Sequence, residues 1–522
     1  MTNPGAAIKV LITYALCIPL AITVGYLLTD PLADYGTTGT FGLIALLLLL
    51  PILLKWHYPI MLFALASPIY CFFLKGNPPL GQVAVLLSFG IAVVERAMNS
   101  ERRFISPAVM VWPLVFTVAM AYMTADLTGG IGLKSLGGGA DGSVGGGKKY
   151  IAIFIGAAAF FALTSRVVTK KQRNWYLAFY FLPGVLQIFG DLAQYLPSPV
   201  NYITYLIPAS YNPNMIVGFS PAVARFGSFA GAAGAVATYM LAKYGLRGIF
   251  QINRPFRFLL FICMFLLTLV GGFRVTLLTF MVVGTLMFFL EGLHRTKMLP
   301  PAILGGLVCM GLLIPFANKL PENFQRALTV VPFLKLDNAA VMDAEGSKEW
   351  RLNIWRDTWP KVPQYLLVGK GYALTAEDYD LMGSGQFAGG VDAAMDRSNE
   401  GLAVSSDYHS GPLSTLIPFG LWGAISVIWL LAAGLFICYR NFRYSDPELR
   451  VVNAFFLASF IWHTVSFFTV FGAYQDEPMS IARVVGFSVA LNWGIRKAAP
   501  RPVAAAQAPA KRRLLPTRPL PA

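Results

Sequence analysis

Residues 257–290 read RFLLFICMFLLTLVGGFRVTLLTFMVVGTLMFFL, two apolar runs that are separated by a short turn containing Arg274. Each run approaches the roughly 20 apolar residues with which a helix crosses the hydrocarbon core of a bilayer. Because hydrocarbon offers no hydrogen-bond partners, the backbone of each run must satisfy its own polar groups, as a helix does. The stretch therefore predicts two successive transmembrane helices with an arginine between them.

Similar apolar runs recur along all 522 residues of the chain. The chain is 56% hydrophobic and 13% charged, with a mean hydropathy of +0.61, whereas soluble domains carry about 25% charged residues. We expect an all-α polytopic membrane protein of about 12–14 transmembrane helices. The candidate spans lie near 8–28, 40–54, 58–75, 80–95, 106–124, 150–168, 175–193, 226–242, 257–272, 275–292, 299–317, 410–438, 451–472 and 480–495.

Lysine and arginine clusters fall in alternate loops, which indicates that these loops are cytoplasmic. The clusters lie at Lys55, Arg96–Arg103, Arg166–Arg173, Lys243–Arg257, Arg295–Lys297, Arg440–Arg450 and in the tail from Arg496. Both termini of the multi-pass protein are then cytoplasmic. The net charge of +16 is interpreted as membrane topology and not as a nucleic-acid surface.

This topology divides the chain into four parts. We expect N-terminal transmembrane helices in 1–317, a large extracytoplasmic (periplasmic) loop in 318–409, C-terminal transmembrane helices in 410–496 and a disordered basic cytoplasmic tail in 497–522. The first span is longer than the 7–15 apolar residues of a signal peptide, so we expect it to be retained. The cysteines lack metal-ligand spacing and are interpreted as small core hydrophobes, at Cys17, Cys71, Cys263, Cys309 and Cys438.

The loop 318–409 carries about half of the 25 acidic residues and is too long for a simple connector. Ser347 is a candidate cap for a helix that ends at Pro360. Trp350, Ile354 and Trp355 share one face of that helix, as in a helix lying among lipid headgroups. A second loop contains GSVGGGKK at 142–149, which fails as a phosphate-binding loop because Lys149 replaces the required serine or threonine.

The chain has four histidines, of which His409 lies where the long loop meets the next span. It is preceded by Asp407 and Tyr408, and a carboxylate such as Asp407 can orient a histidine that accepts a proton. The alternative is an inert interfacial histidine. His57 and His294 fall in basic cytoplasmic turns, while His463 lies inside a span and is interpreted as a packing residue. No second ligand accompanies His409, so no metal site is expected.

Topology places Arg225, Arg274 and Arg351 on the same side of the membrane as His409. An arginine at the edge of a span is either a functional group or one that extends to the lipid headgroups. The placement of all three arginines and His409 on one side of the membrane favours a functional role for the arginines, because guanidinium groups match the geometry of phosphate. A lipid that bears a diphosphate would require such donors.

Four ordered segments of the chain resemble the bacterial O-antigen ligase and polymerase superfamily of membrane glycosyltransferases. They are Asn212-Pro-Asn214 followed by Arg225-Phe-Gly-Ser; Gly272-Phe-Arg274; Arg351-Leu-Asn-Ile-Trp355 followed by Pro363-Gln-Tyr-Leu-Leu-Val-Gly369-Lys-Gly371; and His409-Ser-Gly-Pro-Leu413 followed by Phe419-Gly420-Leu-Trp-Gly423. The chain departs from the family pattern at Phe273, Val275 and Ser410, where the family usually has a small residue, glycine and asparagine.

The resemblance implies a GT-C-like fold and a glycosyl transfer that uses no metal, nucleotide sugar or cofactor. An undecaprenyl-diphosphate-linked glycan is the implied donor, and lipid A–core or another lipid-linked glycan is the implied acceptor. Arg274 and Arg351 would bind the diphosphate, and His409 would act on the acceptor hydroxyl. Arg225, Asp407, Tyr408 and Trp355 are the further candidate substrate-binding residues.

Three functional hypotheses follow. A ligase-like transferase is the first, with a polymerase of the same superfamily as its alternative. A transporter of lipid-linked oligosaccharides is the second, and it predicts ionisable residues near the bilayer midplane and short loops. A membrane scaffold is the third, and it predicts that substitution of His409 or Arg274 leaves function intact.

Overall fold

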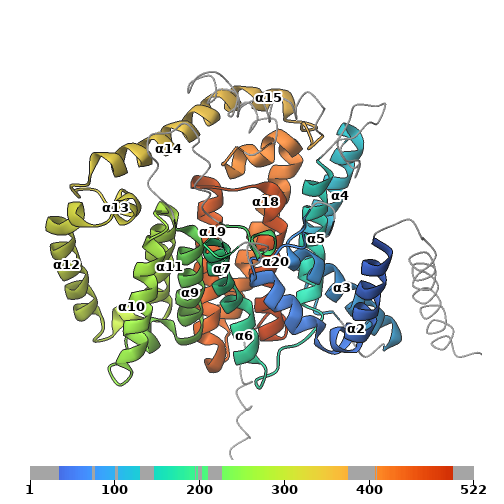
Figure 1. Ribbon diagram of the computed structural model, residues 1–522, viewed down its shortest axis with the longest axis horizontal. Coiled ribbons are helices and arrows are strands. Elements are labelled where there is room, and N and C mark those ends of the chain that lie inside the picture. The colour runs from blue at the N-terminus through green and yellow to red at the C-terminus, as the bar shows by residue number, and fades with distance from the viewer. Residues whose placement is uncertain are drawn as a thin grey trace, which may run out of the picture.

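The computed structural model describes residues 35–72, 74, 77–99, 104–129, 146–193, 195–197, 203–209, 226–373, 406 and 408–497, with backbone only for 35–50. Every regular element in these ranges is helical, which confirms the all-α class (Figure 1). The retained first span, the glycine-rich loop at 142–149 apart from its last residues, and the tail beyond 497 lie outside the described residues.

Six helical stretches are long and apolar enough to cross a membrane. They are Leu80–Met98 (α3), Ala108–Thr128 (α4), Arg173–Ala193 (α6, η1 and α7), Leu299–Lys319 (α12 and η3), Gly411–Arg443 (α18) and Pro447–Thr469 (η5 and α19). Shorter apolar helices cover Pro51–Ala66, Pro255–Leu269 (α10) and Arg274–Leu290 (α11). Gly147–Leu163 (α5), Gly227–Ile249 (α9) and Glu477–Asn492 (α20) complete the bundle. Hydropathy alone therefore located most spans to within a few residues.

The largest difference from the expected spans lies near the N-terminus. The runs 40–54 and 58–75 form one helix, Tyr35–Ala66 (α2), which contains Pro51 and Pro59. The expected turn at Lys55 is thus inside the helix, and His57 is a buried helical residue instead of a turn residue. His57 Nδ1 lies 2.8 Å from Ser88 Oγ of α3, so the side chain that was assigned to a turn links two helices.

A network of buried amides holds α18, α19 and α20 together. Asn453 and Asn492 exchange two hydrogen bonds of 2.9 and 2.8 Å, and Asn441 Nδ2 donates to Ser488 Oγ at 3.0 Å. Each amide would be costly in hydrocarbon without a partner, so mutual pairing specifies the register of the three helices. These helices form the central part of the bundle (Figure 1).

The long loop places short helices across one end of the bundle (Figure 1). Glu322–Leu328 (α13) packs against the hairpin of α10 and α11 through Ala327 and Leu328. Asn338–Thr358 (α14) then leads to Val362–Tyr365 (α15) above α18. The helix α14 begins well before Ser347, so the expected cap at Ser347 is wrong. Asp337 occupies that position because the stretch from Asn338 is rich in helix-forming alanines.

The face of α14 that carries the tryptophans packs on protein. Ile354 is buried with Tyr408, Leu413 and Ile417, and Trp350 and Trp355 contact the same cluster. The expected seat among lipid headgroups is therefore wrong for Ile354, whose side chain is 2% exposed. Apolar burial against α18 accounts for the i, i+4, i+5 pattern that the sequence shows.

The segment after α15 repairs a break in α18. At Gly420, φ is +60° and the helix is interrupted, so Leu421 N donates to Leu366 O at 2.8 Å. The released carbonyl of Ile417 accepts from Lys370 N at 2.7 Å, and that of Pro418 accepts from Gly371 N at 3.0 Å. The loop thus replaces the lost helical hydrogen bonds, as irregular backbone within a membrane bundle requires.

Two cysteines differ from expectation. Cys71 and Cys438 are buried, as expected for small core residues. Cys263 of α10 and Cys309 of α12 are exposed, because these helices present much of their apolar surface outward. An outward apolar side chain is stable where the surrounding medium is hydrocarbon.

Substitution of Gly420 tests the docking of the loop on α18. Gly420→Ala should lower the melting temperature of the purified protein in detergent. The positive φ alone costs about 1–2 kcal/mol for a residue with a Cβ, and the new atom would lie 2.4 Å from Leu366 O. Gly284→Ala is the matched control, since no atom lies within 4 Å of its added Cβ in α11. An equal decrease in both variants would contradict the proposed docking.

Candidate functional site

Arg274 is the first residue of α11, at the turn that joins α10 to α11. Gly272 in this turn has φ of +65°, and Phe273 N-caps the helix in an extended conformation. The side chain of Arg274 is partly exposed and has interaction partners of its own. Glycine is favoured at such a φ, so the local sequence accounts for the sharp reversal that places Arg274 at the end of the hairpin.

Arg326 connects this turn to the long-loop helix. Its guanidinium donates to the carbonyl oxygen of Gly272 and to the carboxylate of Asp343 on α14. The Arg326 side chain is 4% exposed and that of Asp343 is 13% exposed. A pair this buried is sensitive to the loss of either partner. Arg326 thereby fixes where α14 lies relative to the start of α11.

Arg351 lies on α14 close to Arg326. It is half-buried, and its Nε atom is buried without a hydrogen-bond partner in the described residues. Burial lowers the pKa of the Arg351 guanidinium, and the positive charge of Arg326 lowers it further. Both effects disfavour a positive charge at this place, and a bound anion would relieve both.

His409 lies immediately before α18, in a strained stretch of backbone. Its φ is +49°, and that of Ser406 is +58°, both unusual for residues with a Cβ. The imidazole is partly exposed and lies against the indole of Trp350 and the ring of Phe471, with centroid distances of 5.1 and 5.3 Å. Strain of this kind is often found at functional sites. Trp350 precedes Arg351 in the chain, so the helix that contacts His409 also carries Arg351.

Trp355 and Tyr408 support the segment around His409. Trp355 Nε1 donates to Tyr408 O at 2.9 Å, and burial raises the pKa of the Tyr408 phenol. Tyr408 is 3% exposed and packs with Ile354 and Leu413. Trp355 also lines a cavity of about 230 Å³ next to Ser410. These contacts position His409, while a direct contact of Tyr408 or Trp355 with substrate stays a prediction.

Two of the expected site residues, Arg225 and Asp407, lie outside the described residues, as does the Asn212-Pro-Asn214 segment. Within the described part of the chain, no three His, Cys, Asp or Glu side chains converge as a metal site would require. The sequence does not single out Arg326, because neither hydropathy nor a motif connects it with Gly272 and Asp343. The one indication in the sequence is an acidic residue, Asp343, on the same loop.

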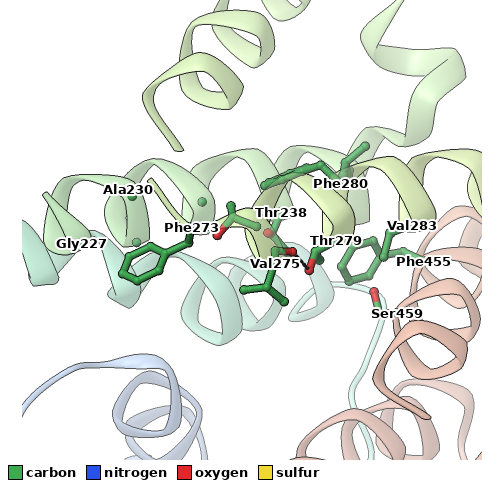
Figure 2. Close-up of a pocket in the computed structure, with 14 residues that line it drawn as sticks. Gly227, Ala230, Thr238, Phe273, Val275, Thr279, Phe280, Val283, Phe455 and Ser459 are labelled. Atoms are coloured by element: carbon green, nitrogen blue, oxygen red, sulfur yellow. Dashed lines mark hydrogen bonds between the residues drawn. The ribbon is translucent and has the colours of Figure 1, made fainter. Parts of the chain in front are cut away.

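A groove runs from the turn before Arg274 along α11. It has a volume of about 360 Å³ and separates α11 from α9 and α19 (Figure 2). Phe273 lies at one end and Ser459 at the other (Figure 2). Small residues on α9 open the groove, and apolar and threonine side chains line it: Gly227, Ala230, Gly231, Gly234, Thr238, Val275, Thr276, Thr279, Phe280 and Val283. Its shape and composition suit an extended apolar chain.

The fold and the site define a polytopic helical membrane protein with arginines and a histidine gathered at one end of its bundle. Residues 259–428 match the model of the family described as O-Antigen ligase. This segment is about a third of the 522 residues and contains Arg274, Arg351 and His409. The match confirms the resemblance to the O-antigen ligase and polymerase superfamily, and in general terms it supports a ligase-like or polymerase-like function. No curated protein and no solved structure matches the chain.

Removal of the Arg326 link should loosen the long loop. Arg326→Met removes the buried ion pair with Asp343 and the hydrogen bond to Gly272 O, and the loss of one member of a buried pair typically costs about 3–5 kcal/mol. We expect a lower melting temperature and faster cleavage by added protease between α12 and α18. The double variant Arg326→Met with Asp343→Leu should regain part of the stability. Lys170→Gln, which removes an exposed ion pair with Glu448, is the control and should change neither measurement. Protease resistance equal to wild type in Arg326→Met would exclude the link.

Proposed function

We propose that the chain transfers a glycan from undecaprenyl diphosphate to a lipid A–core or glycan acceptor on the extracytoplasmic face of the bacterial inner membrane. The observation that carries the proposal is that α14 contacts both ends of the site: Trp350, next to Arg351 in the chain, lies against His409, and Asp343 of the same helix pairs with Arg326, which also binds the carbonyl of Gly272 before Arg274. A ligase-like reaction is the first candidate, and a polymerase of the same superfamily is the alternative. The basic clusters from Arg96 onward support a cytoplasmic C-terminus.

The arginines suit a donor that carries a diphosphate. Asp343 neutralises Arg326, and Arg351 is the cation whose charge is disfavoured until an anion binds. Arg351 has a buried Nε–H with no described acceptor, and a phosphate oxygen would satisfy it. In the reaction the bond between the anomeric carbon and the phosphate oxygen breaks. Negative charge then grows on the diphosphate, where positioned cations stabilise it most.

His409 is proposed as the proton acceptor for the attacking hydroxyl. As the acceptor oxygen forms its bond to the anomeric carbon, the hydroxyl proton passes to the imidazole and the diphosphate leaves. The ring is held between Trp350 and Phe471 and is partly exposed, so it is both oriented and accessible. A diphosphate is a good leaving group, so positioning, cations and one base account for the chemistry.

The groove along α11 is proposed to hold the polyprenyl chain of the donor. It begins at Phe273 and Val275, the two neighbours of Arg274, and continues along α11 to Val283. A donor whose diphosphate contacts Arg274 would direct its lipid chain into this groove. The apolar lining matches an isoprenoid, since each buried CH₂ contributes about 0.8 kcal/mol.

A transporter of lipid-linked oligosaccharides is the second candidate from a different class. It is favoured by one observation, the ionisable side chains of His463, Glu477 and Arg483 within α19 and α20. The long folded loop and its arginines favour the transferase. The two hypotheses differ in where the lipid-linked glycan accumulates after loss of function.

Arg351→Gln and His409→Ala test the transferase. Each variant is expressed in a strain that lacks the chain. The mature surface glycan should be lower than with wild type by about 10²-fold or more, because loss of one transition-state contact often lowers the rate by this factor. Arg356→Gln is the matched control, since Arg356 lies on the same helix and is exposed. All variants are compared at equal amounts of membrane-inserted protein. Wild-type glycan in both test variants would remove the catalytic assignment.

The lipid-linked glycan in the same strains separates the alternatives. For a transferase, the donor should accumulate on the extracytoplasmic face, where an impermeant glycosidase or lectin reaches it. Accumulation of long chains would identify a ligase, and single repeat units a polymerase. Accumulation on the cytoplasmic face would support the transporter instead.

Val275→Trp tests the groove. The indole should fill the space next to Phe273 and weaken the apparent affinity for a long-chain donor by about tenfold, equivalent to about two lost CH₂ contacts. A synthetic donor with a very short prenyl chain should lose little, because it does not extend along α11. Met281→Trp is the control and should retain wild-type kinetics with both donors, because Met281 is exposed on the same helix and does not line the groove. An equal loss with both donors would contradict a lipid-binding role for the groove.

A further inference from the structure

A second cavity lies inside the bundle, beside the groove. It has a volume of about 480 Å³, and its walls come from α19, α20, α9 and the segment of η1. We name it the polar chamber, because uncharged and charged polar side chains form much of its lining. Its polar members are Tyr180, Gln187, Thr238, Ser459, Trp462, His463, Ser466, Ser480 and Arg483, and Phe181, Phe455 and Phe456 also line it. Polar side chains within a membrane bundle usually line a water-filled or ligand-binding space.

His463 and Glu477 form a hydrogen-bonded pair at the chamber. His463 Nε2 lies 2.8 Å from Glu477 Oε2, and the Glu477 side chain is 6% exposed. The His463 side chain is 29% exposed, and its Nδ1 makes no hydrogen bond within the described part of the chain. A buried carboxylate thus fixes the orientation of an imidazole whose second nitrogen is available to a ligand. The sequence suggested a packing role for His463. In the structure Nε2 is satisfied by Glu477, whereas Nδ1 is available to a ligand.

Gln187 reaches the chamber through a notch in α9. A Cβ added at Gly231 would lie 1.7 Å from Gln187 Oε1, so the amide occupies the space that a larger residue would fill. An amide carries both donors and an acceptor. Together with three serines, it offers hydrogen bonds of both kinds without a net charge.

The charges in the chamber disfavour a phosphate. Arg483 is the one arginine in the lining, and its guanidinium carbon lies 6.0 Å from the ring centroid of Tyr180. The Glu477 carboxylate, hydrogen-bonded to His463, would repel an anion that approached His463. Aromatic faces combined with amide, hydroxyl and imidazole groups match instead a ligand with many hydroxyls and little charge.

The chamber and the groove adjoin each other. Gly231, Gly234, Thr238, Phe455 and Ser459 line both, and Trp462 Nε1 donates to Thr279 Oγ1 of the groove at 2.8 Å. Figure 2 shows Phe455 and Ser459 at the part of the groove away from Phe273. A ligand in the chamber is therefore next to the space proposed for the donor lipid.

We infer that the polar chamber binds sugar hydroxyls of a substrate, with His463 Nδ1, Gln187 and the chamber serines as hydrogen-bond partners. This inference rests on the proposed glycan transfer and deepens it, because it assigns a place to the carbohydrate. The sugar belongs either to the lipid-linked donor or to the acceptor. The two sources share the same hydroxyl chemistry and are separated by the experiment.

Binding to the purified full-length chain tests the inference with three probes. They are undecaprenyl diphosphate, the undecaprenyl-diphosphate-linked glycan extracted from the host, and lipid A–core from the same host. The test variants are His463→Gln and Gln187→Leu. Gln187→Leu leaves the pair of His463 and Glu477 intact, so it remains informative if His463→Gln folds poorly. His57→Gln is the matched control, a buried helical histidine that lines neither the groove nor the chamber.

If the chamber binds the donor sugar, both test variants should weaken binding of the lipid-linked glycan by about tenfold, as expected for one lost hydrogen bond. Their affinity for undecaprenyl diphosphate should stay within about twofold of wild type. The same loss for lipid A–core, with donor binding unchanged, would assign the chamber to the acceptor. Equal losses for undecaprenyl diphosphate and its glycan, or wild-type affinity for all three probes, would overturn the inference.

Arg351→Gln distinguishes failure of the chamber inference from failure of the proposed diphosphate site. It should weaken undecaprenyl diphosphate and its glycan alike, because both carry the diphosphate. If Arg351→Gln leaves both affinities unchanged, the proposed diphosphate site is wrong, whatever the chamber variants show. If Arg351→Gln weakens both and the chamber variants weaken neither glycan probe, the chamber inference alone is wrong.

Discussion

Backbone hydrogen bonds that hydrocarbon cannot satisfy are the constraint on which the site depends. The break of α18 at Gly420 releases the amide of Leu421 and the carbonyls of Ile417 and Pro418, and water cannot reach them inside a membrane bundle. The segment after α15 supplies the missing partners and is thereby fixed to α18. Because the same loop carries Arg351 and leads to His409, a local repair of helical hydrogen bonds places the groups that the proposed chemistry needs.

Electrostatics acts at the other end of the loop. Arg326 joins the turn before Arg274 to Asp343 of α14, so one buried guanidinium sets the distance between two segments that are far apart in sequence. Its charge also lowers the pKa of the Arg351 guanidinium, which favours binding of an anion there. The arrangement is typical of a preorganised anion site, in which cations are held apart by the fold before the ligand arrives.

The groove and the polar chamber extend this site into the bundle. Phenylalanines, valines and small residues line the groove, whereas hydroxyl, amide and imidazole groups line much of the polar chamber. Five residues line both. An amphipathic substrate with an isoprenoid and a carbohydrate has the same division between apolar and polar parts. A histidine within an apolar span is a packing residue or a ligand-binding group according to its partners. For His463 the deciding partner is Glu477, which lies on a different helix.

The sequence by itself determined the helical class, most of the spans and the motif residues Arg274, Arg351 and His409, because the length and hydropathy of a span follow directly from the thickness of the bilayer. It did not determine the early start of α14, the continuity of α2, or the burial of Ile354 against α18. The tertiary structure alone decided the partners of Arg326, the pair of His463 with Glu477 and the exchange of hydrogen bonds at Gly420. These contacts join residues from separate elements, and hydropathy describes each element alone, so only the packed bundle specifies which of them meet.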